Sequence, residues 1–391
     1  MDRVLFTNVR VVLPSRIVSG SVLVENGTIA AVSEDAAGRC FTGEGAARES
    51  FDGKGRYLVP GFIDIHNHGR LGVNVMDSAE ALEKVARGQL AHGVTGFLAG
   101  TSTRPWDEVL ASVRVIAEYC RGDRPDRSQC LGIYSEGTFF SHEKRGAHNP
   151  AWLSPPGETL IDDLCEAGGD ALKVVALSPE IPGALDAVSR LRRRGLVVAA
   201  AHSNADYGEA AAGIDAGISL STHTFNGMRG LHHQDPGILG AVLNDDRVFC
   251  ELIADGIHIS PPVLSMVYKL KGAGGTVLVS DSVELNGLPD GEYRGGDGQV
   301  TLRNGAIRLA DGRLAGSCLS LDQAVRNMTV LAGVPLWEAA AMASLTPARV
   351  LGLDARKGSI EPGKDADMAL LDETLAVQAV FIGGKACSLT C

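Results

Sequence analysis

The sequence lacks any uninterrupted apolar run of the roughly 18 residues that a membrane-spanning helix needs. Its first eight residues, Met1 to Asn8, lead directly into strand-like sequence, without a basic segment followed by an apolar one. We therefore expect a soluble protein that has neither an export signal nor a membrane span.

Long basic blocks and Cys-x-x-Cys pairs are also absent. The formal net charge is −11, with 47 acidic against 36 basic residues, which disfavours binding to nucleic acid or to an acidic membrane. Eight scattered cysteines indicate reduced, mostly buried thiols in a cytoplasmic protein. The 391 residues, 45% of them hydrophobic, suit one large α/β barrel with an accessory domain or two medium domains.

Both ends of the chain are rich in strand signals. Near the start, two β-rich runs flank Asn26-Gly27, the strongest short signal for a hairpin. Near the end, Gly363–Asp372 reads as a strand, and Val377–Phe381 followed by Gly383-Gly384 predicts a second hairpin. We expect residues 1–56 and 357–391 to form one small β-sandwich domain, with residues 57–356 inserted between its two parts.

Eight strand-like apolar runs alternate with helix-like segments in the inserted region, as in a (β/α)8 barrel of the TIM type. The runs are Phe62–His66, Gly96–Thr101, Cys130–Glu136, Leu172–Ser178, Val197–Ser203, Ser219–Phe225, Phe249–Asp255 and Val277–Ser282. Helices are expected at Ala79–Leu90, at Pro105–Tyr119 and at about 320–332 and 336–352. Residues 283–316 form a glycine-rich excursion with a predicted hairpin at Gln299–Leu302 and Ala306–Leu309.

Polar and metal-binding residue types gather at the carboxyl ends of these runs, where a barrel of this type has its active site. His66 and His68 lie one residue apart after a buried strand, so both rings emerge on one side and can hold one metal ion. Glu136, His202 and His223 end three other strands and form a three-ligand set that leaves a position open for water. Taken singly, each also fits a structural role, as a solvated glutamate or a core histidine.

Two further residues could assist a metal at this end of the barrel. Asp281 ends the eighth run, where a carboxylate can take a proton from a metal-activated water and return it to a leaving group. His148 lies in the loop Lys144-Arg-Gly-Ala-His-Asn-Pro150, and by itself it fits a surface histidine as well as a catalytic one.

In this order, the motifs resemble the amidohydrolase superfamily and, within it, the N-acetylglucosamine-6-phosphate deacetylase family. The similar stretches span nearly the whole chain: Pro60–Gly69, Glu136-Gly137, Lys144–Pro150, Lys173–Glu180, Ala201–Ala205, Thr222–Met228, Ala254–His258, Ser280–Ser282 and Leu314–Ser317. The resemblance implies a metal on Glu136, His202 and His223, with Asp281 as general base and then acid. It implies that His148 polarises the acetamide carbonyl.

The resemblance also implies a substrate pocket, which includes Ala147, His148, Asn226, Gly227, Gln234, His258 and the Leu314-Ala315-Gly316-Ser317 backbone. Three departures stand out. Thr138 replaces a family proline and Ser280 and Ser282 replace Thr and Ala, which leaves both acids in place. Gln234 stands where the family usually has an arginine that binds the sugar phosphate, and glutamine has neither its charge nor its bidentate fork. Arg229, His232 or His233 could compensate.

We therefore predict a metal-dependent hydrolase that converts N-acetyl-D-glucosamine 6-phosphate to D-glucosamine 6-phosphate and acetate. Alternatives are another N-acyl hexosamine, such as N-acetylgalactosamine 6-phosphate or an unphosphorylated sugar, or a different amidohydrolase acting on N-acyl-D-amino acids or cyclic amides. A non-catalytic sugar-binding relative would have lost a ligand or the base, and Glu136, His202, His223 and Asp281 are all present.

The predicted cofactor is a divalent metal, one or two ions per chain, with zinc favoured and iron, manganese or cobalt as alternatives. Some family members bind one metal and have no His-x-His pair, so His66 and His68 point to a second ion that shares Glu136 or a bridging water, with Asp281 as a possible further ligand. The resemblance also suggests a homodimer in which the Met228–Gly237 loop helps to complete the neighbouring site.

Overall fold

The computed structural model describes residues 2–41, 49–122, 126–295 and 298–389. Its central feature is a parallel eight-stranded barrel with the strand order β15-β14-β13-β12-β11-β10-β9-β6. In chain order the strands are β6 (Phe62–Asn67), β9 (Val94–Gly100), β10 (Gln129–Ser135), β11 (Leu172–Leu177), β12 (Val197–Ala200), β13 (Leu220–Ser221), β14 (Phe249–Leu252) and β15 (Thr276–Leu278). All eight predicted strands are confirmed.

The barrel closes through hydrogen bonds between β6 and the residues that follow β15. The Asp281 N–H donates to the His66 carbonyl at 2.9 Å, and the His68 N–H donates to the Ser282 carbonyl at 2.8 Å. Beneath these bonds, the fully buried Asp64 carboxylate accepts from the backbone N–H (3.1 Å) and the hydroxyl (2.6 Å) of Ser280. The first and last strands are therefore joined at the end that carries His66, His68 and Asp281.

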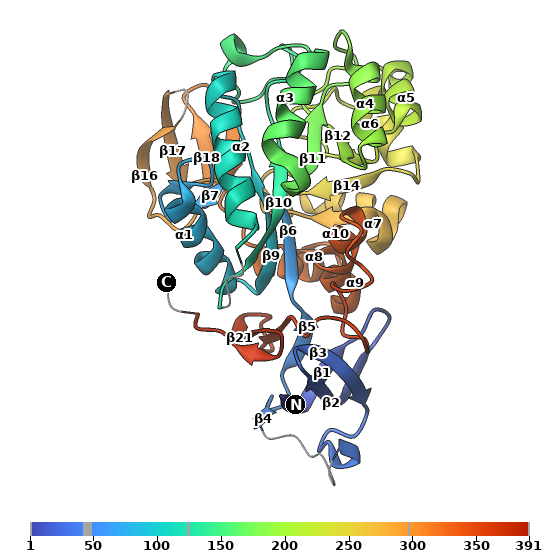
Figure 1. Ribbon diagram of the computed structural model, residues 1–391. Helices are drawn as coiled ribbons and strands as arrows, with labels where there is room; N and C mark the ends of the chain where they lie inside the picture. Colours follow the sequence, from blue (N-terminus) through green and yellow to red (C-terminus); the bar gives the residue numbers. More distant parts are fainter. Residues whose placement is uncertain (1, 42–48, 123–125, 296–297, 390–391) are drawn as a thin grey trace.

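Helices surround the barrel, and Figure 1 shows them on its outer side. They are α1 (Ala79–Leu90), α2 (Trp106–Cys120), α3 (Glu158–Gly168), α4 (Ala184–Arg193), α5 (Tyr207–Ala216), α6 (Gly237–Asn244), α7 (Pro261–Gly275), α8 (Leu321–Leu331), α9 (Leu336–Met342) and α10 (Leu345–Val350). In α1, Ser78 caps the first turn by accepting from the Ala81 N–H, and Leu82, Val85 and Ala86 are buried. No described helix is both long and apolar enough to cross a bilayer.

The single helix predicted at 336–352 is wrong, because α9 ends at Met342 and α10 begins at Leu345. Pro347 has no N–H and its ring would clash with the carbonyl four residues earlier, which belongs to Ala343. The Ala343 carbonyl instead accepts from the Ile63 N–H of β6 at 2.8 Å. The break therefore ties the last helices to the barrel strand that leads to His66.

Both ends of the chain contribute to one β unit, as predicted, but its strands form a single connected sheet. The strand order is β22-β21-β20-β5-β1-β2-β3, with β4 also paired to β1. The strands are β1 (Arg3–Val12), β2 (Ile17–Glu25), β3 (Thr28–Ser33), β4 (Glu49–Asp52), β5 (Tyr57–Pro60), β20 (Met368–Leu371), β21 (Val377–Ile382) and β22 (Lys385–Ala386). Both predicted hairpins are present, and Asn26 and Gly27 have positive φ angles (51° and 82°), as a tight turn of this kind requires.

This terminal sheet has a core of its own, which includes Phe6, Val24, Met368 and Phe381. It lies at the amino-terminal end of β6, because β5 leads into β6 through the single residue Gly61 (Figure 1). Since β5 pairs with β1 and β20, residues 57–60 belong to this sheet although the predicted boundary assigned them to the barrel. The division into two domains stays a prediction.

The glycine-rich excursion forms a four-stranded antiparallel sheet. The predicted hairpin is β17 (Gly298–Arg303) and β18 (Ala306–Leu309), flanked by β16 (Gly291–Gly295) and β19 (Leu314–Ser317). Sequence analysis did not identify these flanking strands. Short two-stranded pairing joins β7 (Gly69–Arg70) to β8 (Val73–Asn74) just after the His-x-His pair.

Replacing Asp64 with Ala should destabilise the barrel. The substitution leaves the Ser280 N–H and other buried donors without an acceptor, which should lower the free energy of unfolding by on the order of 3 kcal/mol. Thermal unfolding followed by circular dichroism should show a clearly lower melting temperature. The control is Asp246→Ala at an exposed position, for which we expect the free energy of unfolding to change by no more than about 0.5 kcal/mol. Equal melting temperatures for the two variants would contradict the closing role of Asp64.

Candidate metal centre

The predicted metal ligands meet at the carboxyl-terminal end of the barrel, at or just beyond the ends of five different strands. All six residues are buried, with at most 8% of their surface exposed: His66, His68, Glu136, His202, His223 and Asp281. His202 and His223 were expected within strands, but β12 and β13 end two residues before them. Both histidines therefore lie in the loops at the mouth of the barrel.

The Glu136 carboxylate stands between two pairs of histidines. Its Oε2 lies 3.1 Å from His68 Nε2 and 3.5 Å from His66 Nε2. Its Oε1 lies 3.0 Å from His223 Nε2 and 3.3 Å from His202 Nε2. A carboxylate with one oxygen on each side can bridge two cations.

Two groups of ligands can be distinguished around Glu136. The first, here called the His66 group, consists of His66, His68 and Asp281, whose ligand atoms all lie within 4.8 Å of one another. The second, the His202 group, consists of Glu136, His202 and His223. In this second group His202 Nε2 and His223 Nε2 are 3.2 Å apart, and His148 also lies within 4.8 Å of the ligand atoms of Glu136 and His202.

Several of the histidine rings are oriented by hydrogen bonds at Nδ1. His68 Nδ1 lies 3.0 Å from the Gly100 carbonyl, and His202 Nδ1 lies 2.8 Å from the Lys144 carbonyl. Since a carbonyl only accepts, Nδ1 carries a proton, and Nε2 is the nitrogen that faces the centre and can bind a metal. Buried nitrogen and carboxylate donors converging in this way fit a divalent metal such as zinc.

The charges of the centre also favour a cation. Burial disfavours protonation of His66 and His68, but the neighbouring carboxylates outweigh it and raise both pKa values, that of His68 to about 9. Despite burial, the histidines hold the pKa of Glu136 well below its ordinary range, and His68 and His66 lower the pKa of Asp281 to about 2. Both carboxylates are therefore ionised at neutral pH and provide negative charge for metal binding.

Unusual backbone conformations gather at the same place. His202, His223 and Asp281 have positive φ angles of 45°, 27° and 47°, which residues other than glycine seldom adopt. Such strain persists only where surrounding structure holds it, and it is concentrated at functional sites. Gly227 (φ 62°) leaves room for the His202 ring, because a Cβ at this position would lie 2.6 Å from His202 Nδ1.

His148 lies beside the His202 group, with its ring 4.6 Å from that of His202. Burial and the charge of His202 lower the pKa of His148 to about 3, so its ring is neutral at physiological pH. Its Nδ1 is hydrogen-bonded to the Thr103 hydroxyl, a partner that sequence analysis did not identify. A neutral imidazole so placed can donate one N–H to a substrate carbonyl.

The structure brings some of the predicted substrate residues to the centre. The Ser317 N–H of β19 donates to the Asp281 carbonyl at 2.9 Å, which sets Leu314–Ser317 beside the predicted base. Arg313 Nη1 donates to the Gly146 carbonyl, which brings this strand close to Ala147 and His148. Asn226 Nδ2 donates to the His223 carbonyl at 3.2 Å, and His258 Nδ1 is 2.6 Å from Asp255 Oδ2.

Gln234 belongs to an exposed loop, in which its N–H donates to His232 Nδ1 at 3.3 Å. Of the three candidates for phosphate binding, Arg229 is paired with the Asp235 carboxylate of the same loop. His232 and His233 are exposed, with their rings 4.1 Å apart. A phosphate would therefore have to compete with the Asp235 carboxylate for Arg229. Among the described residues, neither His232 nor His233 is paired with a carboxylate.

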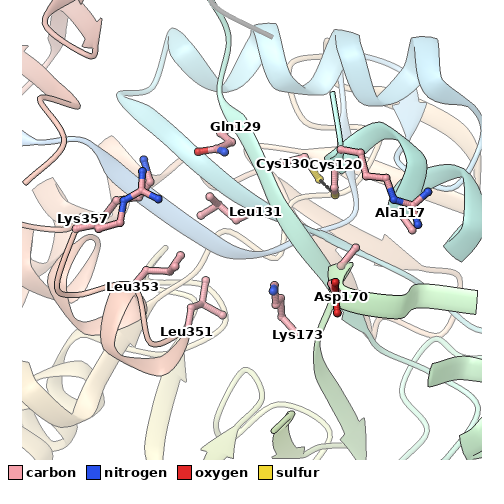
Figure 2. A pocket seen from close by; sticks show the side chains of 13 residues that line it. Ala117, Cys120, Gln129, Cys130, Leu131, Asp170, Lys173, Leu351, Leu353 and Lys357 are labelled. Atoms are coloured by element: carbon pink, nitrogen blue, oxygen red, sulfur yellow. Dashed lines mark hydrogen bonds between the residues drawn. The ribbon is translucent and has the colours of Figure 1, made fainter. Parts of the chain in front are cut away.

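Sequence analysis missed Glu251, a fully buried carboxylate in β14 that contacts both His66 and His223. Its signal in the sequence is a single charge between apolar residues in Phe249-Cys-Glu-Leu252. A separate cavity of about 360 Å³ is lined by residues near the starts of β10 and β11, such as Gln129 and Lys173, which Figure 2 shows. The predicted site residues do not line that cavity.

Comparisons with known proteins agree with this geometry. The family model described as "Amidohydrolase family" matches residues 57–387. The chain is 42% identical over 332 residues to N-acetylgalactosamine-6-phosphate deacetylase of Escherichia coli O157:H7, covering 85% of this chain and 88% of that protein. It is 36% identical over 371 residues to N-acetylglucosamine-6-phosphate deacetylase of Vibrio furnissii, covering 92% and 88%.

Solved structures of similar proteins have the same fold. N-acetylglucosamine-6-phosphate deacetylase from Pasteurella multocida superposes with a TM-score of 0.91 at 26% identity, covering 98% of this chain and 99% of that one. A mutant of the Mycobacterium smegmatis deacetylase, in complex with N-acetyl-D-glucosamine 6-phosphate, gives a TM-score of 0.90 at 30% identity and 99% coverage of both chains.

Replacing both His66 and His68 with Asn should remove one cation position and leave the other. The His202 group keeps all its ligands in this variant, so we expect metal analysis to find one ion per chain in the variant and two in the unaltered protein. Circular dichroism would verify that the variant is folded. One ion in both proteins would show that the His66 group holds no metal.

Proposed function

The chain belongs to the Amidohydrolase family, and from this premise we propose that it hydrolyses the acetamide of an N-acetylhexosamine 6-phosphate. The products would be acetate and the free amino-sugar phosphate. The observation that carries this proposal is the position of Glu136 between two pairs of buried histidines, with Asp281 beside them at the mouth of the barrel. That arrangement suits hydrolysis assisted by a divalent metal.

We propose that the metal is held by Glu136, His202 and His223, with His66, His68 and Asp281 holding a second ion. When bound, the metal supplies a Lewis acid that lowers the pKa of a water from about 15.7 towards about 7. Zinc suits these nitrogen and oxygen donors best, and iron, manganese and cobalt can use the same ligands.

Asp281 would act as general base and then as general acid. Its Oδ1 lies 3.3 Å from His68 Nε2, and the carboxylate is ionised at neutral pH, the form that a general base needs. It would take the proton of the attacking water and deliver it to the amide nitrogen as the carbon–nitrogen bond breaks. His148 would donate a hydrogen bond to the carbonyl oxygen, where negative charge develops in the tetrahedral intermediate.

The sugar would lie among Ala147, Asn226, Gly227, His258 and the Leu314–Ser317 backbone. N-acetylglucosamine 6-phosphate is the substrate we propose first, in line with the Vibrio, Pasteurella and Mycobacterium relatives. N-acetylgalactosamine 6-phosphate is the second candidate, because the Escherichia coli relative is 42% identical. With Gln234 in place of the family arginine, we propose that Arg229, His232 or His233 binds the phosphate.

We also propose a cytoplasmic homodimer. None of the seven described cysteines forms a disulfide, which is consistent with a reducing compartment. The loop Met228–Gly237, which is exposed at residues 230–234, would contact the partner subunit and help to complete its site.

Asp281→Asn should lower kcat by about 100- to 10,000-fold, because an amide cannot accept the proton of the attacking water. The ion in the His202 group should remain, since Asp281 is not one of its ligands. Acetate release and metal content would be measured together, with Asp246→Asn as an exposed control of the same chemistry. Near-normal turnover by Asp281→Asn would refute its assigned role.

The substrate is tested by comparing kcat/KM for N-acetylglucosamine 6-phosphate, N-acetylgalactosamine 6-phosphate and unphosphorylated N-acetylglucosamine. We expect a preference for the phosphorylated sugars of at least about 10-fold, since one charge-assisted hydrogen bond contributes roughly 1.5–3 kcal/mol. The ratio between the two phosphorylated epimers decides between the two candidates. Equal kcat/KM with and without phosphate would show that the phosphate is not recognised and that the 6-phosphate assignment is wrong.

A further inference from the structure

Glu251 lies in the middle of β14, on the inside of the barrel beneath the metal centre. Both Glu251 and His66 are fully buried. An ionised carboxylate is costly to bury, by several kcal/mol, unless partners compensate for its lost hydration. Its partners should therefore show what it does.

One oxygen of Glu251 reaches both groups of ligands. Glu251 Oε2 lies 2.9 Å from His66 Nδ1, and it accepts the backbone N–H of His223 at 3.0 Å. Since a carboxylate oxygen only accepts, Nδ1 of His66 carries a proton, and Nε2 is the nitrogen left to bind a metal. That Nε2 is the atom that faces His68 Nε2, at 3.1 Å.

The partner of Nδ1 separates His66 from the other histidines of the centre. His68 and His202 direct Nδ1 to neutral backbone carbonyls, and His223 Nδ1 is buried without a hydrogen-bond partner. Only His66 among these four has a carboxylate at Nδ1. A carboxylate makes the ring a more basic ligand than a carbonyl does.

The ring of Tyr134 packs against one face of the His66 ring. The two rings are stacked, with centroids 4.4 Å apart and planes 17° from parallel. The Tyr134 hydroxyl is 2.7 Å from the Thr222 hydroxyl, so the tyrosine is itself anchored. With Glu251 at Nδ1 and Tyr134 on the face, His66 is held in one orientation.

From these contacts we propose that Glu251 is a positioning residue, which holds the ring of His66 and by its charge makes Nε2 a more basic ligand, so that the His66 group can bind the second cation. This inference rests on the metal centre of the proposed function. It adds that occupancy of the second position depends on a carboxylate that touches neither metal nor substrate.

The test is the metal affinity of Glu251→Gln. Glutamine has nearly the same shape and its carbonyl can still accept the His223 N–H, but it has no charge to offer His66. Metal-loaded protein would be equilibrated with increasing chelator, and the ions retained per chain would be counted. We expect one ion to be bound about 10- to 100-fold more weakly, which is the usual effect of losing such a partner, and the other to be bound as before.

A further variant makes the result specific. In a His66→Asn background, Glu251→Gln should have no further effect on the remaining ion, because it acts through His66. If Glu251→Gln does not fold, Glu251→Asp replaces it, since Asp keeps the charge but withdraws the oxygen, and the same weakening is expected.

Normal affinity for both ions in Glu251→Gln, or equal loss of both, would overturn the proposal. Only one ion in the unaltered protein would also overturn it, although deacetylation could still occur. Two ions without hydrolysis of any N-acetylhexosamine would instead refute the proposed function and leave the role of Glu251 standing.

Discussion

The centre depends on the contacts of the Glu136 carboxylate with both pairs of histidines. Four buried imidazoles lie close together, and the distances between their Nε2 atoms fall to 3.1 and 3.2 Å within the two pairs. Such an arrangement is unfavourable unless negative charge or metal ions lie between the rings. Glu136 supplies one oxygen to each pair, while Asp281 adds a second carboxylate on the His66 side. The strained φ angles of His202 and His223 are the local cost of this convergence.

The rest of the fold keeps these ligands in place. Because the barrel closes between β6 and the segment after β15, His66, His68 and Asp281 are joined by main-chain hydrogen bonds as well as by their side chains. Two buried carboxylates inside the barrel support these ligands. Asp64 stabilises the closure through Ser280, and Glu251 is hydrogen-bonded to His66. The terminal sheet lies at the opposite end of β6. Ligand geometry is thus built on rigid elements, whereas loops provide His148 and the predicted sugar pocket.

Much of this could be predicted from sequence, because the signals were local. Buried parallel strands are short apolar runs, and the chemistry sits where each run ends, so eight strands and six candidate ligands could be identified. Features that depend on distant partners could not. Pro347 marks the helix break before α10 locally, but the hydrogen bond from Ile63 of β6 to the freed Ala343 carbonyl depends on a distant strand. The strands β16 and β19 likewise form only through pairing with the hairpin between them. Glu251 was missed because its role lies in contacts with His66 and His223, 185 and 28 residues away along the chain.

The most direct test of this account is anomalous X-ray diffraction from crystals of the metal-loaded protein, measured at the absorption edge of the bound metal. We predict two anomalous peaks, one on each side of the Glu136 carboxylate, with His66 and His68 at one and His202 and His223 at the other. A single peak, or a peak at any other location in the barrel, would contradict the claim that Glu136 joins two cation positions.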